Sequence, residues 1–149
     1  MNIVVATDGS ESAIDAARRA IDLLRTDAQV VLVTVIPEYE DPQSDAGGFE
    51  GPVISDKEAA EDWKKATAAG QSALDRTAAV LGPEVEVRLF PDDESTGVAV
   101  VRVAHEMNAD VLVIGSSTKN WLSRHFGSSV SDYVAHHAPC PVMLIRHDH

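Results

Sequence analysis

The alternation of short apolar runs with longer segments of helical periodicity is the feature that most constrains the fold of this chain. The runs 3–7 and 29–36 are apolar nearly throughout, which is typical of strands covered on both faces. The run 84–90 alternates charged with apolar residues, which predicts a strand at a sheet edge. Strand and helix follow each other four times and 141–146 closes the chain, so we expect an α/β, doubly wound, Rossmann-like fold with helices on both faces of a mostly parallel five-stranded sheet.

The first helix is predicted from an apolar stripe over 13–24 that is rich in alanine. Ser10 or Ser12 can cap it, because a serine hydroxyl accepts a hydrogen bond from a free amide of the first turn. Asp15 stands three residues beyond Ser12, as in a capping box. The position of the cap is therefore left open between the two serines.

Two further helices are predicted over 56–81 and 97–107. The first of these ends at Gly82 and Pro83, a pair that is typical of helix C-termini. Trp63 falls on its apolar face and is predicted to be a packing residue. The residues of 97–107 predicted to face inward are Val100, Val101 and Ala104.

Length, charge and cysteine content narrow the class of protein. The 149 residues predict a single domain, 1–149, and the lone Cys140 allows no internal disulfide, which favours a cytoplasmic protein. We expect no membrane insertion, because no apolar run is long enough to span a bilayer. The net charge of −12 makes nucleic acid an unfavourable partner. Strong acidity with only four lysines fits either a halophilic source or an ordinary acidic protein.

The segment 39–55 is a long acidic loop without periodicity. Loops of this length in a compact domain are usually functional or disordered. Nothing in its sequence specifies a ligand, so its role stays open.

A candidate anion site follows the run Val111–Ile114, which reads as a buried strand that Gly115 ends. Ser128 and Ser129 then stand at the start of the last helix, whose inward face carries residues at helical spacing from Val130 onward. A helix N-terminus presents unpaired amide donors and partial positive charge, and phosphate binds well there. The alternative is that the two serines only cap the helix.

Three blocks of sequence carry a resemblance to a known family. They are VVATDGSESA, LVTVIPE, and NADVLVIGSS with LSR and SSVSDYVAHHAPCPVMLIR, and their order and spacing extend over nearly the whole chain. In this combination the chain resembles the universal stress protein family. The resemblance implies an adenine-nucleotide alpha-hydrolase-like fold and the function of a non-catalytic stress-response regulator.

Many members of that family bind ATP through Gly-x-x-Gly, nine residues, and then Gly-Ser or Gly-Thr. This chain keeps Gly115 and Ser129, but Thr118 and Ser128 stand at the second and third glycine positions. A β-branched residue tolerates positive φ poorly, and a side chain hinders backbone approach to phosphate, although both replacements bring hydroxyl donors. The predicted site is therefore degenerate, and the alternative is a family branch that lacks nucleotide binding and acts only through protein–protein contacts.

The resemblance also assigns contacts within this degenerate site. The adenine would meet the backbone of Val35 and the ribose or phosphate would meet Asp8, with Mg²⁺ as a possible companion of ATP. Asp8 could equally stabilise the turn that contains it. The predicted cofactor-binding residues are Ala6, Asp8, Val35, Ile114, Gly115, Thr118, Ser128, Ser129 and Val130.

Partners and catalysis complete the expectations. The resemblance implies a homodimer through the last strand, Val142 to Arg146, and an apolar edge strand also invites such pairing. Protein partners are unknown. We expect no metal site, since the histidines lack ligand spacing. No dedicated base or attacking group for phosphoryl transfer is evident, so enzymatic activity would be slow ATP hydrolysis at most.

Overall fold

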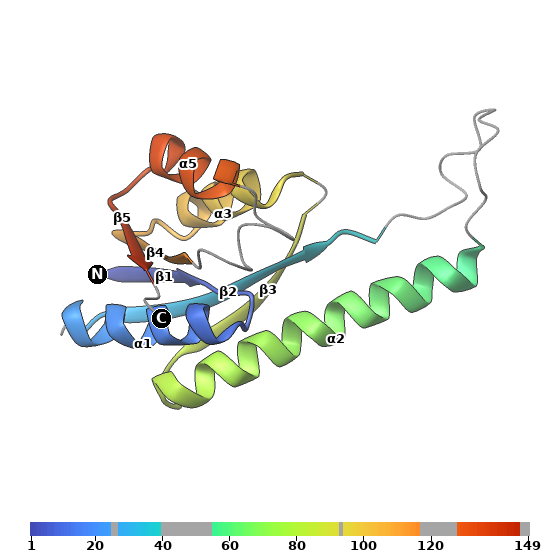
Figure 1. The fold of residues 1–149 in the computed structure, drawn as a ribbon, viewed down its shortest axis with the longest axis horizontal. Coiled ribbons are helices and arrows are strands. Elements are labelled where there is room, and N and C mark those ends of the chain that lie inside the picture. Colours follow the sequence, from blue (N-terminus) through green and yellow to red (C-terminus); the bar gives the residue numbers. More distant parts are fainter. Residues whose placement is uncertain (25–26, 40–54, 93, 117–127, 147–149) are drawn as a thin grey trace.

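The computed structural model of the chain describes residues 1–24, 27–39, 55–92, 94–116 and 128–146 (Figure 1). Strands and helices alternate through this part of the chain. In order they are β1 (Asn2–Ala6), α1 (Glu11–Leu24), β2 (Gln29–Pro37), α2 (Asp56–Leu81), β3 (Glu86–Asp92), α3 (Thr96–Glu106), β4 (Val111–Ser116), α5 (Ser128–His137) and β5 (Val142–Arg146).

The five strands form one parallel sheet in the order β3-β2-β1-β4-β5. The predicted α/β fold is confirmed, and β3 lies at an edge, as its charged alternation indicated. In the register of the sheet, Ala6 pairs with Val33 of β2 and with Ile114 of β4. The carboxyl ends of the three central strands therefore lie along the same edge of the sheet.

Helices cover both faces of this sheet. Figure 1 shows α1 and α2 on one face and α3 and α5 on the other. Alternate strand residues feed the two cores: Val4 belongs to the cluster with α3 and α5, whereas Val5 belongs to the cluster with α1 and α2. In α3, Val100 and Ala104 are buried as expected, Val101 is half-buried and packs against the same cluster, and Val103 is also fully buried.

Helix α2 starts and stops at the predicted residues. The Ser55 hydroxyl accepts from the amide of Glu58 and the Glu58 carboxylate accepts from the amide of Ser55, a reciprocal cap, and Gly82 follows the last turn with φ 106°. Only the C-terminal half of α2 packs on the sheet, and Figure 1 shows its N-terminal half extending past it. Trp63, on that extending half, is 36% exposed and outside the core, and its ring packs on that of Tyr39.

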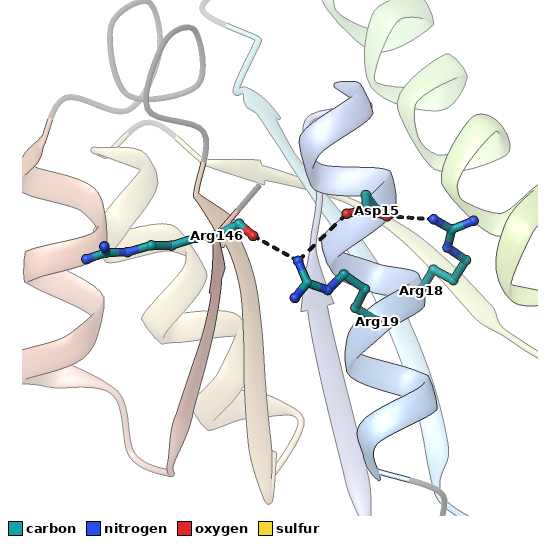
Figure 2. Close-up of polar contacts among 4 residues, drawn as sticks. All are labelled: Asp15, Arg18, Arg19 and Arg146. Atoms are coloured by element: carbon teal, nitrogen blue, oxygen red, sulfur yellow. Dashed lines mark hydrogen bonds and ion pairs between the residues drawn. The ribbon is translucent and has the colours of Figure 1, made fainter. Parts of the chain in front are cut away.

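The start of α1 settles the question of its cap. The Ser10 hydroxyl accepts from the Ala13 amide at 3.2 Å, so Ser10 caps the helix and Ser12 lies inside it. The capping box with Asp15 therefore does not form, and the Asp15 carboxylate instead accepts from Arg18 at 2.6 Å (Figure 2). 

The same helix is tied to the last strand. Figure 2 shows Arg19 donating from Nη1 to the backbone oxygen of Arg146 at the end of β5, at 3.0 Å. Asp15 Oδ2 lies 4.0 Å from the same guanidinium nitrogen. These contacts hold the end of the edge strand β5 against α1.

In the described part of the chain, none of the helices combines the length and apolarity that a membrane span needs.

Candidate functional site

The turn after β1 places Asp8 at the carboxyl edge of the sheet. Its Oδ1 accepts from the Ser10 amide at 2.9 Å, which is the turn-stabilising role considered for this residue. Gly9 has a φ of 75°, and a Cβ there would lie 2.7 Å from the Cα of Ala73 on α2. Positive φ and close packing both require glycine here, so the position of Asp8 is fixed by the backbone.

Three threonine hydroxyls hold this turn against its neighbours. Thr77 donates to the Ala73 carbonyl at 2.8 Å, so the 2.9 Å contact between the Thr7 and Thr77 hydroxyls is donated by Thr7. Thr7 Oγ1 in turn accepts from the Gly9 amide at 3.1 Å, and Thr34 donates to the Thr7 carbonyl at 2.7 Å. These buried groups are satisfied, and the network joins the ends of β1 and β2 to α2.

A cleft of about 900 Å³ opens at this edge, and both Asp8 and Val35 line it. Its walls come from the turn after β1, the ends of β2 and β3, the start of α3, and residues 59–73 of α2. Val35 is half-buried and pairs with Phe90 of β3. Two of the predicted contact residues therefore share one cavity, of a size that small-molecule sites commonly have.

Three other predicted site residues lie in the buried core next to this edge of the sheet. Ala6, Ile114 and Val130 belong to one buried cluster and are at most 6% exposed. Their side chains are therefore not available to a ligand at this edge. Val130 in this cluster also fixes the first turn of α5 beside the ends of β1 and β4.

Gly115 has a packing role that the sequence did not reveal. It does not end β4, which continues to Ser116, and it pairs with Ile145 of β5. A Cβ at Gly115 would lie 2.9 Å from the Cβ of Ala16 and 3.1 Å from the Cα of Ala13. The absence of a side chain thus lets α1 approach the sheet, whatever else the glycine does.

Several predicted features lie outside the described residues. Thr118 is among them, as are 40–54 of the acidic loop. Ser128 and Ser129 form the first turn of α5, inside the helix rather than before it, and their side chains are likewise not described. Their predicted phosphate contacts stay predictions.

The carboxyl edge of the sheet also carries an ion-pair cluster that the sequence analysis did not predict. Arg102 on α3 donates from Nη1 to Asp92 Oδ2 at 2.7 Å and from Nη2 to Glu94 Oε1 at 2.9 Å. Asp92 Oδ1 also accepts from the Glu94 amide at 2.8 Å, and its side chain is fully buried. The sequence Pro-Asp-Asp-Glu is typical of an exposed turn and gave no signal for a buried carboxylate.

Within the described ranges, no three His, Cys, Asp or Glu side chains gather closely enough to hold a metal ion.

Comparison with known proteins identifies relatives over the whole chain. The family model described as the universal stress protein family matches residues 1–146. A putative universal stress protein of Staphylococcus aureus is 32% identical over 148 residues, which cover 97% of this chain and 83% of that protein.

Solved structures of similar proteins include two nucleotide complexes. The crystal structure of a universal stress protein in complex with cAMP has 26% identity and a TM-score of 0.60, and covers 97% of this chain and 96% of its own. The structure of the universal stress protein from Archaeoglobus fulgidus in complex with dAMP has 26% identity and a TM-score of 0.59, with 97% of each chain covered. Both ligands are adenine nucleotides.

Proposed function

The chain belongs to the universal stress protein family, and from that premise we propose that it is a stress-response regulator that binds an adenine nucleotide without a catalytic role. The observation that carries the proposal is that Asp8 and Val35 line one cleft at the carboxyl edge of the sheet. Ligands of open α/β sheets bind at this edge, where the strand order reverses. The cAMP and dAMP complexes of two similar proteins support an adenine nucleotide as the ligand class.

In this proposal the chain contributes contacts along the edge. The adenine lies against the backbone of Val35, and Oδ2 of Asp8 accepts from a ribose hydroxyl while Oδ1 keeps its bond to the Ser10 amide. The phosphate meets amide donors at Gly115 and at the start of α5, in Ser128, Ser129 and Val130. A helix N-terminus suits that contact, because its amides are unpaired and its dipole favours an anion.

The charge of the cleft bears on which nucleotide binds. Besides Asp8, the carboxylates of Glu38 and Asp62 line it. They would repel a triphosphate more than a monophosphate, unless Mg²⁺ neutralises part of the phosphate charge. We therefore expect AMP to bind more tightly than ATP without the metal, with ATP gaining most from Mg²⁺.

A regulator without a nucleotide site is the second candidate. Thr118 and Ser128 in place of glycines favour it, since both make backbone approach to phosphate harder. In that case the protein would act through partner contacts alone.

Calorimetric titration with AMP, cAMP, and ATP with and without Mg²⁺ separates the two candidates. Asp8→Asn keeps an oxygen for the Ser10 amide and removes the charge, and it should weaken AMP binding by about tenfold, the value of a hydrogen bond to a charged group. Asp75→Asn, an equal charge change on the exposed face of α2, is the control. If no nucleotide gave binding heat at millimolar concentration, the first candidate would be excluded and the regulator without a nucleotide site would remain.

We also propose that the protein is a homodimer through β5. This strand, Val142–Arg146, lies at a sheet edge, and Leu144 on it is 45% exposed. Pairing with the same strand of a second copy about a two-fold axis would satisfy its outer backbone groups and cover the leucine.

A further inference from the structure

The outer part of the cleft is formed by four exposed residues, Glu38, Tyr39, Asp62 and Trp63, and none of them is among the proposed nucleotide contacts. Tyr39 follows β2 and Trp63 stands in the N-terminal half of α2, and their rings meet edge to face with centroids 5.8 Å apart. The two residues are 45% and 36% exposed. This pair therefore presents aromatic surface to solvent in the lining of the cleft, where a ligand can contact it.

The same cleft is strongly acidic. Among the described residues that line it, none is lysine or arginine, and five carry carboxylates. Arg102 pairs with two of them from outside and offsets one charge. The carboxylates lining the cleft are those of Asp8, Glu38, Asp62, Asp92 and Glu94.

We propose that this outer part of the cleft docks a basic peptide segment of a partner protein. Lysine or arginine side chains of the segment lie over the Trp63 ring and between the carboxylates of Glu38 and Asp62, because a ring face attracts cations and acidic neighbours add to that attraction. Apolar side chains between the cations enter the cleft beside Ala59 and Ala66 of α2. The proposal does not require a bound nucleotide, although Glu38 and Asp62 also contribute to the charge that a nucleotide would meet in the cleft.

Charge distinguishes this occupant from others. The chain's own segment 40–54 contains four acidic residues and no basic one, so acidic walls disfavour it. A nucleotide phosphate in the outer part of the cleft is disfavoured for the same reason, whereas the proposed phosphate contacts lie at Gly115 and the start of α5. The carboxylates are spread from the turn after β1 to α2, which suits an extended ligand with spaced cations better than one compact ammonium. The net charge of −12 would also speed the encounter with a basic partner.

Fluorescence anisotropy of a labelled peptide in which lysine and leucine alternate tests the proposal, at about 0.15 M salt to suppress unspecific attraction. The full chain should bind it, and a peptide with glutamate in place of lysine should not bind. Trp63→Ala should weaken binding by about fivefold, with Trp63→Phe recovering part of it, because a cation–π contact contributes on that scale. Asp62→Asn should weaken binding by about threefold.

Glu61→Gln is the matched control, since Glu61 is the exposed neighbour of Asp62 on α2 and does not line the cleft. Equal weakening by Glu61→Gln and Asp62→Asn would mean that only net charge attracts the peptide and would overturn the proposal. Unchanged binding in Trp63→Ala would also overturn it. A third outcome would also overturn the proposal: spermidine binds, its binding depends on Trp63 in the same way, and the peptide does not compete with it. That result would assign the cleft to a small polyamine. The affinity of the Trp63→Ala variant for AMP should equal that of the wild type. The two proposals can therefore fail independently of each other.

Discussion

Arg102 and Asp92 form an ion pair across the rim of the sheet, with Nη1 2.7 Å from Oδ2 and the aspartate side chain fully buried. The Asp92 carbonyl also accepts from the Glu38 amide at 3.3 Å, so this residue joins the ends of β2 and β3 to α3. The pair therefore holds together one wall of the cleft. A buried carboxylate depends on its partner, because desolvation is costly for an unpaired charge.

Replacing Arg102 should consequently destabilise the fold. Arg102→Met leaves the Asp92 charge buried without its cation, and we expect a loss of about 2–4 kcal/mol in the free energy of unfolding, measured with urea. Arg18→Met removes an exposed pair with Asp15 and should cost less than about 0.5 kcal/mol. Similar losses in the two variants would contradict the role assigned to Asp92.

A side chain at Gly115 should also destabilise the protein. In Gly115→Ala the new Cβ meets Ala16 and Ala13 of α1 at distances that force a shift, so we expect a loss of about 1–3 kcal/mol on urea unfolding. Ala16→Gly in the same chain should recover part of it, because it removes the nearest of the contacts. An unchanged stability would mean that α1 does not pack on β4 as closely as described. Any loss of nucleotide affinity in Gly115→Ala has to be corrected for this packing effect.

The order of elements and the sheet edge were predictable because they depend on local patterns. The apolar runs, the charged alternation of 84–90 and the Gly82-Pro83 pair each reflect the environment of neighbouring residues along the chain. Whether Asp92 is buried depends on Arg102, which lies ten residues away on another element. Trp63 fits an apolar stripe, but the sheet does not extend as far as that part of α2. Local sequence patterns do not predict where a sheet ends.

The candidate site was predicted in part for the same reason. Because all strands are parallel, the residues after β1 and β4 had to share an edge, and the register of Ala6 with Ile114 confirms this. The family resemblance pointed to Asp8 and Val35, which line one cleft. The second reason for a glycine at Gly115 was hidden, because it lies in the approach of α1 from a distant part of the chain.

Restoring the family glycines should strengthen nucleotide binding if the proposed site is correct. In the double variant, Thr118→Gly allows positive φ without strain and Ser128→Gly removes a side chain at the start of α5, where backbone would approach phosphate, so we expect AMP affinity to rise by about fivefold or more. Calorimetry measures the change. Thr67→Gly, on the exposed part of α2, controls for a general effect of added glycine. An unchanged or lower affinity would show that the two side chains are not what weakens the site.

The single thiol should react slowly. Burial raises the pKa of Cys140, and the Asp110 carboxylate raises it further, so less thiolate is present at neutral pH than in a free cysteine. We expect the rate of alkylation by iodoacetamide in the native protein to lie below that of the urea-unfolded chain at pH 7 and to keep rising at pH values where a free thiol has levelled off. A native rate equal to the unfolded rate would contradict both the burial and the shift.

The proposed dimer predicts a specific effect of Leu144, at the middle of the edge strand β5. Leu144→Lys would place a charge beside its symmetry mate across a two-fold axis, and lysine on an edge strand opposes pairing. We expect the wild type to have a dimer mass by light scattering and the variant to dissociate at protein concentrations at least about tenfold higher, since like charges facing each other cost several kcal/mol. Leu23→Lys is the control for an added charge at an exposed leucine, because Leu23 is 69% exposed and belongs to α1 and not to β5. If Leu144→Lys stayed dimeric while Leu23→Lys became monomeric, α1 and not β5 would carry the interface, and the outer backbone groups of β5 would need another partner.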